Sequence, residues 1–221
     1  MSRWKNFSYW KYFFDIFTVF LGVMLAFMAN NWKDDWHNRQ LRQQYWTNFF
    51  QEITANQQEM DSVIAINQQR VQQMQRLVQV MQNTPTLSKD SLHTILNLLT
   101  RVNMIQLRTA TYEAAKNSGI WHLFTNQAIM IQLVQYYQKV EEVQWMQEIF
   151  LRFFNQQTIP YLQKHVDFLS LNVKHNLLQE VEFRNIFIVQ YTLLDQLVNQ
   201  YRELQQLGKQ ILNQTTSSTV S

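Results

Sequence analysis

The longest apolar run of the chain lies near its amino end and restricts the fold more than any other feature. Residues 13–29 read FFDIFTVFLGVMLAFMA and contain one charged side chain, that of Asp15. A helix that spans a bilayer needs about 20 apolar residues, and aromatic residues prefer the two membrane interfaces. Tryptophans that suit this interfacial role flank the run: Trp10, Trp32 and Trp36.

We therefore predict a transmembrane helix over residues 13–32, preceded by a short cytoplasmic amino terminus, residues 1–12. A cleaved signal peptide is the alternative, but residues 26–29 offer a poor cleavage site because Met28 is bulky. Lys and Arg are balanced on the two sides of the run, and the free amino group favours the amino end inside. The bulk of the chain would then be periplasmic, anchored in a bacterial inner membrane by a single pass.

One stripe of the predicted anchor is small and polar. Positions three or four apart share one face of a helix. Small residues let two helices approach closely, and polar ones hydrogen-bond between them. The stripe, which we interpret as a packing face for another transmembrane helix, consists of Asp15, Thr18, Gly22, Ala26, Ala29 and Asn30. An acid in a membrane helix is a functional candidate, although Lys11 lies four residues before Asp15 and is placed to pair with it.

The rest of the chain reads as helix. Only 3 Gly and 2 Pro occur in 221 residues, too few to form the turns of a many-stranded sheet. From Trp46 to Met81 apolar residues hold a seven-residue repeat, interrupted by Gln57 and Asn67, which is typical of a long bundle helix. We predict an all-α fold in which the anchor continues into this helix and joins an antiparallel bundle of three to four helices with short inserts.

The predicted bundle domain covers residues 33–213, and residues 214–221 form a flexible tail. Pro85 ends the first helix and Ser88 caps the second, Thr125 caps a later one, and Pro160 bends or interrupts that later helix. The helices after the first are expected at about Lys89–Thr100, Arg108–Asn117, Thr125–Asn155 and Val181–Asn213.

Three segments resemble a known family: Gly22–Trp32, which ends in Asn-Asn-Trp; Thr111–Gly119, which reads TYEAAKNSG; and, more weakly, Glu182–Asn185. In this order they are similar to a family of small, single-anchor bacterial membrane proteins of unknown function. In that family the anchor carries an acid near its start, where Asp15 stands here. Ala115 departs from the family's bulkier apolar residue. The resemblance implies a membrane location and an all-helical ectodomain, and it implies no activity.

The sequence contains no catalytic motif, so we expect no enzyme, cofactor or metal. His165, Asp167 and His175 are a possible metal set, but surface or capping histidines are the simpler interpretation. A net charge of +3, scattered along the chain, does not favour nucleic acid. A possible partner or ligand corner contains Tyr112, Glu113, Lys116 and Gly119; the alternative is a packing corner in which Tyr112 is buried and Gly119 makes the turn.

These features favour a structural or accessory subunit that associates, through its anchor and bundle, with itself or with a larger membrane protein complex. A periplasmic sensor is the alternative, and it would need a signalling partner because only about a dozen residues precede the anchor. An oligomeric pore lined by Asp15, Thr18 and Asn30 is a third interpretation.

Overall fold

The computed structural model describes residues 6–83, 89–124, 126–170, 172–173 and 177–218, and it confirms the all-α prediction. Two short strands, β1 (Val166–Asp167) and β2 (Asn172–Val173), pair as a small antiparallel ribbon. The α-helices are α1 (Asn6–Asn83), α2 (Lys89–Thr100), α3 (Ala110–Ser118), α4 (Gln127–Phe153), α5 (Ile159–His165) and α6 (Val181–Ser218).

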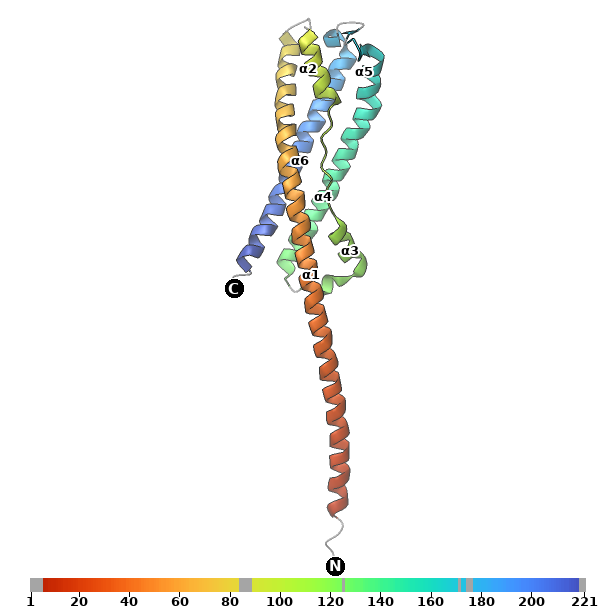
Figure 1. The fold of residues 1–221 in the computed structure, drawn as a ribbon, viewed down its shortest axis with the longest axis vertical. Coiled ribbons are helices and arrows are strands. Elements are labelled where there is room, and N and C mark those ends of the chain that lie inside the picture. The colour runs from red at the N-terminus through yellow and green to blue at the C-terminus, as the bar shows by residue number, and fades with distance from the viewer. Residues whose placement is uncertain (1–5, 84–88, 125, 171, 174–176, 219–221) are drawn as a thin grey trace, which may run out of the picture.

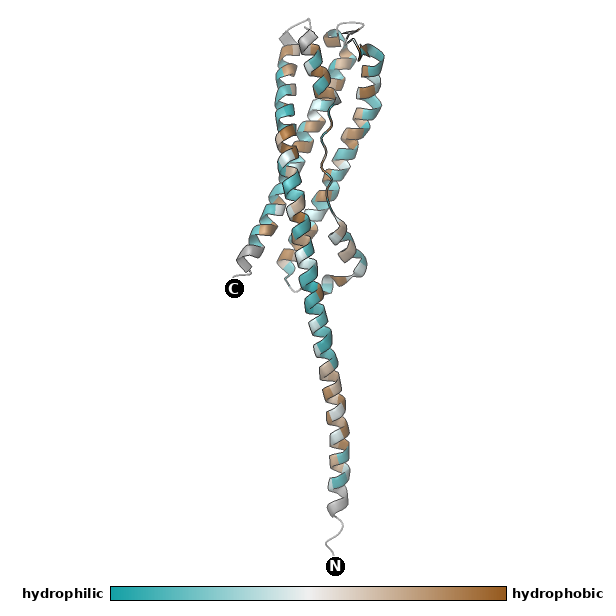
Figure 2. Ribbon diagram, viewed as in Figure 1, coloured by the Kyte–Doolittle hydropathy of each residue, from teal (hydrophilic) through white to brown (hydrophobic). Residues whose placement is uncertain are grey.

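Helix α1 runs without a break through the predicted anchor and into the bundle, as expected from the lack of a helix breaker (Figure 1). Its first part, residues 10–37, projects away from every other element and is wholly exposed; we call it the arm. The arm is apolar over residues 13–29, and a largely polar stretch, residues 33–40, lies between that surface and the bundle (Figure 2). The bundle contacts of α1 include Leu41, which packs on the core, and Arg42, which donates to the oxygen of Leu123.

The bundle consists of four segments of the chain, and consecutive segments run antiparallel to each other. Helices α1 and α4 run away from the arm, and α6 runs back between them, packed against both (Figure 1). Helix α2 also runs back along α1, but it is short. The extended segment 101–109, which we call the strap, continues from α2 along the bundle to α3. The predicted antiparallel arrangement is therefore present, with the fourth helix replaced over half its length by extended chain.

The core follows the predicted seven-residue repeat of α1. Ile53, Met60 and Met74 have no exposed surface, and they pack against apolar side chains of the other helices. The two polar interruptions are also buried and bind main-chain oxygens. The side-chain amide of Gln57 donates to the carbonyl oxygen of Gln205 at 3.0 Å, and that of Asn67 donates to the carbonyl oxygen of Asn103 at 2.9 Å. The buried amides thus fix the position of α1 within its own chain.

Several helix ends differ from the prediction. Asn126 caps α4, since its side-chain oxygen accepts from the main-chain nitrogens of Ala128 and Ile129. Thr125, the predicted cap, lies outside the described residues, as do Pro85 and Ser88. Pro160 does not end the helix: a π-helical turn, Phe154–Thr158, precedes it, and α5 continues to His165. A wider turn accommodates the missing N–H group of a proline.

The last helix is longer than predicted. It ends at Ser218 instead of Asn213, so the helix enters the segment that the sequence assigns to a tail. No Gly or Pro occurs after Gly208 to stop it.

Candidate functional site

The arm of α1 is the first candidate site. One helix of the described chain is long and apolar enough to cross a membrane, and its apolar window is wholly exposed. The three tryptophans predicted as interfacial anchors lie on the surface of the arm, with exposed fractions of 64% for Trp10, 77% for Trp32 and 58% for Trp36. Exposed apolar surface of this extent marks a site that another molecule or a membrane covers.

The predicted packing face lies along this arm, and no other part of the described chain covers it. All six of its residues are exposed: Asp15, Thr18, Gly22, Ala26, Ala29 and Asn30. A methyl group built on Gly22 would meet nothing within 4 Å. The hydroxyl of Thr18 donates to the carbonyl oxygen of Phe14 at 2.8 Å, within the same helix. The side-chain amide of Asn30 donates to Asp34 at 3.4 Å.

The pairing of Lys11 with Asp15 is not formed. Among the described residues, no ion pair within 4.0 Å joins these two side chains. The carboxylate of Asp15 is therefore exposed on the same face as Gly22.

The second candidate site is the corner around α3, which the structure builds mainly as a packing corner. Tyr112 is half-buried and stacks on Tyr137 of α4, with ring centroids 4.3 Å apart and an interplanar angle of 11°. Gly119 has φ 66°, the left-handed conformation that the sequence predicts for the helix end. Only Glu113, Lys116 and Gly119 of the predicted corner face solvent. The partner or ligand role of this corner stays a prediction.

A buried carboxylate holds the start of α3 in place. Glu52 of α1 is only 7% exposed, and each of its oxygens has a donor. The hydroxyl of Tyr137 donates to Oε1 at 2.5 Å, and the main-chain nitrogen of Thr111 donates to Oε2 at 2.8 Å. The negative charge lies beside the first turn of α3, where it is stabilised by the helix dipole. Burial, with the bond to Glu52, raises the pKa of Tyr137, so its phenol is neutral and acts as a donor.

The strap is attached to α1 by a series of polar side chains that the sequence analysis missed. An extended chain packed on a helix needs partners for its main-chain N–H and C=O groups. The side chain of Asn56 makes two bonds to Arg108, accepting from its nitrogen at 2.9 Å and donating to its oxygen at 3.0 Å. Glu59 accepts from the nitrogen of Gln106 at 2.9 Å.

These contacts form one line on α1, which we call the polar ladder: Glu52, Asn56, Glu59, Asn67 and Arg70. Their spacings of four, three, eight and three residues place all five on one face of the helix. Two further side-chain amides, from α4 and α6, bind main-chain oxygens of the strap and of the last turn of α2. Gln147 of α4 donates to the oxygen of Ile105 at 3.0 Å, and Gln190 of α6 donates to that of Leu99 at 2.8 Å. The sequence is rich in Gln and Asn, and these buried amides are a structural use of part of that content.

The possible metal set is not assembled among the described residues. His165 stacks on Tyr161 with ring centroids 4.3 Å apart, and its Nδ1 lies 3.7 Å from Glu180. His175 lies outside the described residues. The described part of the chain contains no group of three or more His, Asp or Glu side chains placed to hold a metal ion.

Comparisons of the chain with protein-family models, with curated proteins and with solved structures found no match.

Proposed function

We propose that the protein is a membrane-anchored helical subunit that associates, through the arm of α1, with itself or with a larger membrane protein complex. The observation that carries this proposal is the contrast along one unbroken helix. Residues 13–29 are apolar and wholly exposed, whereas Phe49 and Ile53 of the same helix are fully buried in the bundle. A helix whose exposed surface is this largely apolar is stable in contact with lipid or protein and not with water.

The small and polar face of the arm supports association rather than anchoring alone. Lipid covers large apolar side chains well, but an exposed carboxylate and an exposed amide in a membrane helix need polar partners. Asp15 and Asn30 lie on the face that contains Gly22, where a second helix can approach closely. The resemblance of Gly22–Trp32 and Thr111–Gly119 to single-anchor bacterial membrane proteins supports a membrane location for the arm.

Gentle extraction of the native protein into a neutral detergent tests this proposal. Light scattering gives the mass of the extracted particle, and mass spectrometry identifies the chains that co-purify with it. We expect either a homo-oligomer or a stoichiometric membrane complex. A monomer that leaves the membrane in alkaline carbonate would refute the proposal.

Two substitutions in the arm separate packing from simple anchoring. Gly22→Ile places a branched side chain on the packing face and is expected to reduce the particle to a monomer. Phe17→Ile, on the opposite side of the arm, introduces the same branched side chain away from the packing face and serves as the control, with the particle unchanged. A particle that is equally large in both variants would contradict the assigned face.

The orientation of the chain is tested separately. The protein has no cysteine, so Gln58→Cys on the exposed side of α1 introduces a single thiol. A periplasmic bundle predicts that a membrane-impermeant maleimide labels this thiol in intact cells. Labelling only after lysis would place the bundle in the cytoplasm.

A further inference from the structure

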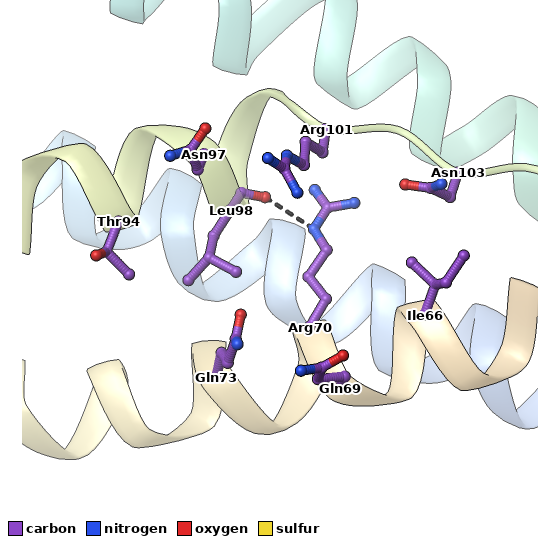
Figure 3. A pocket seen from close by; sticks show the side chains of 9 residues that line it. All are labelled: Ile66, Gln69, Arg70, Gln73, Thr94, Asn97, Leu98, Arg101 and Asn103. Atoms are coloured by element: carbon purple, nitrogen blue, oxygen red, sulfur yellow. Dashed lines mark hydrogen bonds between the residues drawn. The ribbon is translucent and has the colours of Figure 1, made fainter.

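A polar cavity of about 560 Å³ lies between α1 and α2, in the half of the bundle far from the arm (Figures 1 and 3). Its volume is within the range of small-molecule sites, which is about 300–1,000 Å³. Amide and hydroxyl side chains line much of it, among them Gln69, Gln73, Thr94 and Asn97.

The side chain of Arg70 enters this cavity from α1 with four of its five N–H donors unused among the described residues. It is only 5% exposed, and its Nε donates to the carbonyl oxygen of Leu98 at 2.8 Å. The two terminal nitrogens, Nη1 and Nη2, are buried and have no hydrogen-bond partner in the described part of the chain. A buried donor without a partner destabilises the fold, and a charged one does so more strongly.

A second cation lies beside the first. Figure 3 shows the side chain of Arg101, at the start of the strap, next to the guanidinium of Arg70. Arg101 itself is exposed. None of the nine residues that line the cavity, all of them described, is acidic. No ion pair in the described part of the chain includes Arg70 or Arg101. Two guanidinium groups therefore meet here without a counter-charge.

We propose that this cavity binds a small organic anion, with a carboxylate or phosphate group held between Arg70 and Arg101. The paired nitrogens of a guanidinium match the oxygens of such a group. The neighbouring amides bind the rest of a polar molecule, and rotation of the exposed Arg101 side chain opens the path to Arg70.

The charge state of Arg70 supports this assignment. Burial, and then the nearby charge of Arg101, lower the pKa of Arg70 to about 10. That value is well above neutral pH, so the side chain is a cation in the cavity under physiological conditions.

A structural role alone does not account for the residue. The bond from Nε to Leu98 joins α1 to the last turn of α2, where main-chain oxygens lack helical partners. A glutamine or lysine at position 70 would supply a donor for the oxygen of Leu98 without placing two further charged nitrogens in a buried site. The unused nitrogens point to a partner that is not part of this chain.

The anion is a soluble molecule and not a headgroup of the bilayer around the arm. Arg70 is 38 residues beyond Trp32 on the same unbroken helix, which is about 57 Å at 1.5 Å per residue. This site therefore goes beyond the proposed anchoring function, because it lies in a part of the chain that the membrane does not reach.

The test is thermal unfolding of the full chain in a maltoside detergent, which contains no phosphate. Sodium phosphate and sodium succinate are titrated separately, with sodium chloride at equal ionic strength as the reference. At a hundredfold excess over Kd, a ligand of the folded state is expected to raise the midpoint by about 5–10 °C. The shift must saturate, and it must exceed that of the chloride reference.

Three variants assign the shift to the cavity. Arg101→Gln is exposed and keeps the fold, and it is expected to weaken anion binding by roughly tenfold to a hundredfold. Arg70→Met is expected to remove the shift and to raise the midpoint in anion-free buffer, because it removes an uncompensated buried charge. Arg76→Met, on the exposed side of the same helix, is the control and should retain the shift.

Three results would overturn the proposal. The first is the absence of a saturable shift with either anion. The second is an equal shift in the wild type and in Arg101→Gln and Arg70→Met. The third is a shift that appears only when phosphatidylglycerol is added to the micelles, because it would identify a lipid headgroup as the ligand.

Discussion

The substitution Gly208→Ala tests the contact between α6 and α1. Gly208 lies in α6 opposite the buried side chain of Gln57, which donates to the oxygen of Gln205. A methyl group built on Gly208 would lie 2.0 Å from Nε2 of Gln57 and 3.2 Å from Cε2 of Tyr136. The first distance is far below contact, so the amide of Gln57 must move and lose its bond.

The expected magnitude follows from opposing effects. Alanine in place of glycine within a helix stabilises by about 0.5–1 kcal/mol. Overpacking costs about 1–3 kcal/mol, and a buried amide left without its bond costs about 1–3 kcal/mol more. The net effect is a loss of about 1–5 kcal/mol. For a chain of this length, each kcal/mol lowers the unfolding midpoint by about 2–4 °C, so the expected fall is about 2–20 °C.

Thermal unfolding of the full chain in detergent, followed by circular dichroism, measures this loss. The double variant Gln57→Ala with Gly208→Ala is the informative control, because it removes the side chain that the new methyl group would displace. We expect Gly208→Ala to cost at least about 1 kcal/mol less in the Gln57→Ala background than in the wild type. A midpoint that rises in Gly208→Ala, or costs that are simply additive, would refute the close approach of these helices.

Two further predictions concern buried groups near α3. Glu52→Gln offers one acceptor oxygen to two donors, the hydroxyl of Tyr137 and the nitrogen of Thr111, so we expect a loss of about 1–3 kcal/mol in chemical unfolding. An unchanged midpoint would contradict the role of Glu52 in holding the start of α3. Burial raises the pKa of Tyr136 and of Tyr201 to about 12, against about 10 when unfolded. The unfolded chain therefore loses these protons first, and stability falls between about pH 10 and 12 by about 1.4 kcal/mol per pH unit for each tyrosine. Tyr136→Phe should make the loss of stability with pH smaller by about 1.4 kcal/mol per pH unit, as measured from unfolding midpoints between about pH 10 and 12. An equal pH dependence in both proteins would contradict the burial of the Tyr136 phenol.

The sequence predicts the regular elements well because their signals are local. The seven-residue repeat of α1 identifies Ile53 and Met60 as core, and both are fully buried. The bounds of α2 agree with the prediction at both ends, and the left-handed conformation of Gly119 ends α3 as expected. Each of these features depends on a few neighbouring residues and on the helical period.

The seven-residue repeat singles out Asn67 as a polar residue at a core position, but the other members of the polar ladder were missed because their partners lie far apart in sequence. Asn56 and Arg108, for example, are 52 positions apart, and the partners of Gln147 and Gln190 are more than 40 positions away. The spacing of polar residues along α1 is visible in the sequence, but nothing local shows that an extended chain, instead of a fourth helix, will cover them. Arg70 was missed for the same reason, since Arg101 joins it only through the fold.

The unbroken course of α1 also fixes the rotation of the bundle about its own anchor. Residues eighteen apart on an α-helix point in the same direction, after about five turns. The direction of Gly22 is therefore shared by Gln40 and Gln58, which are both exposed on α1. No hinge separates them from the arm, so the bundle cannot swivel independently of it. A partner that packs against Gly22 thereby also selects which side of the bundle it meets, some tens of ångströms away.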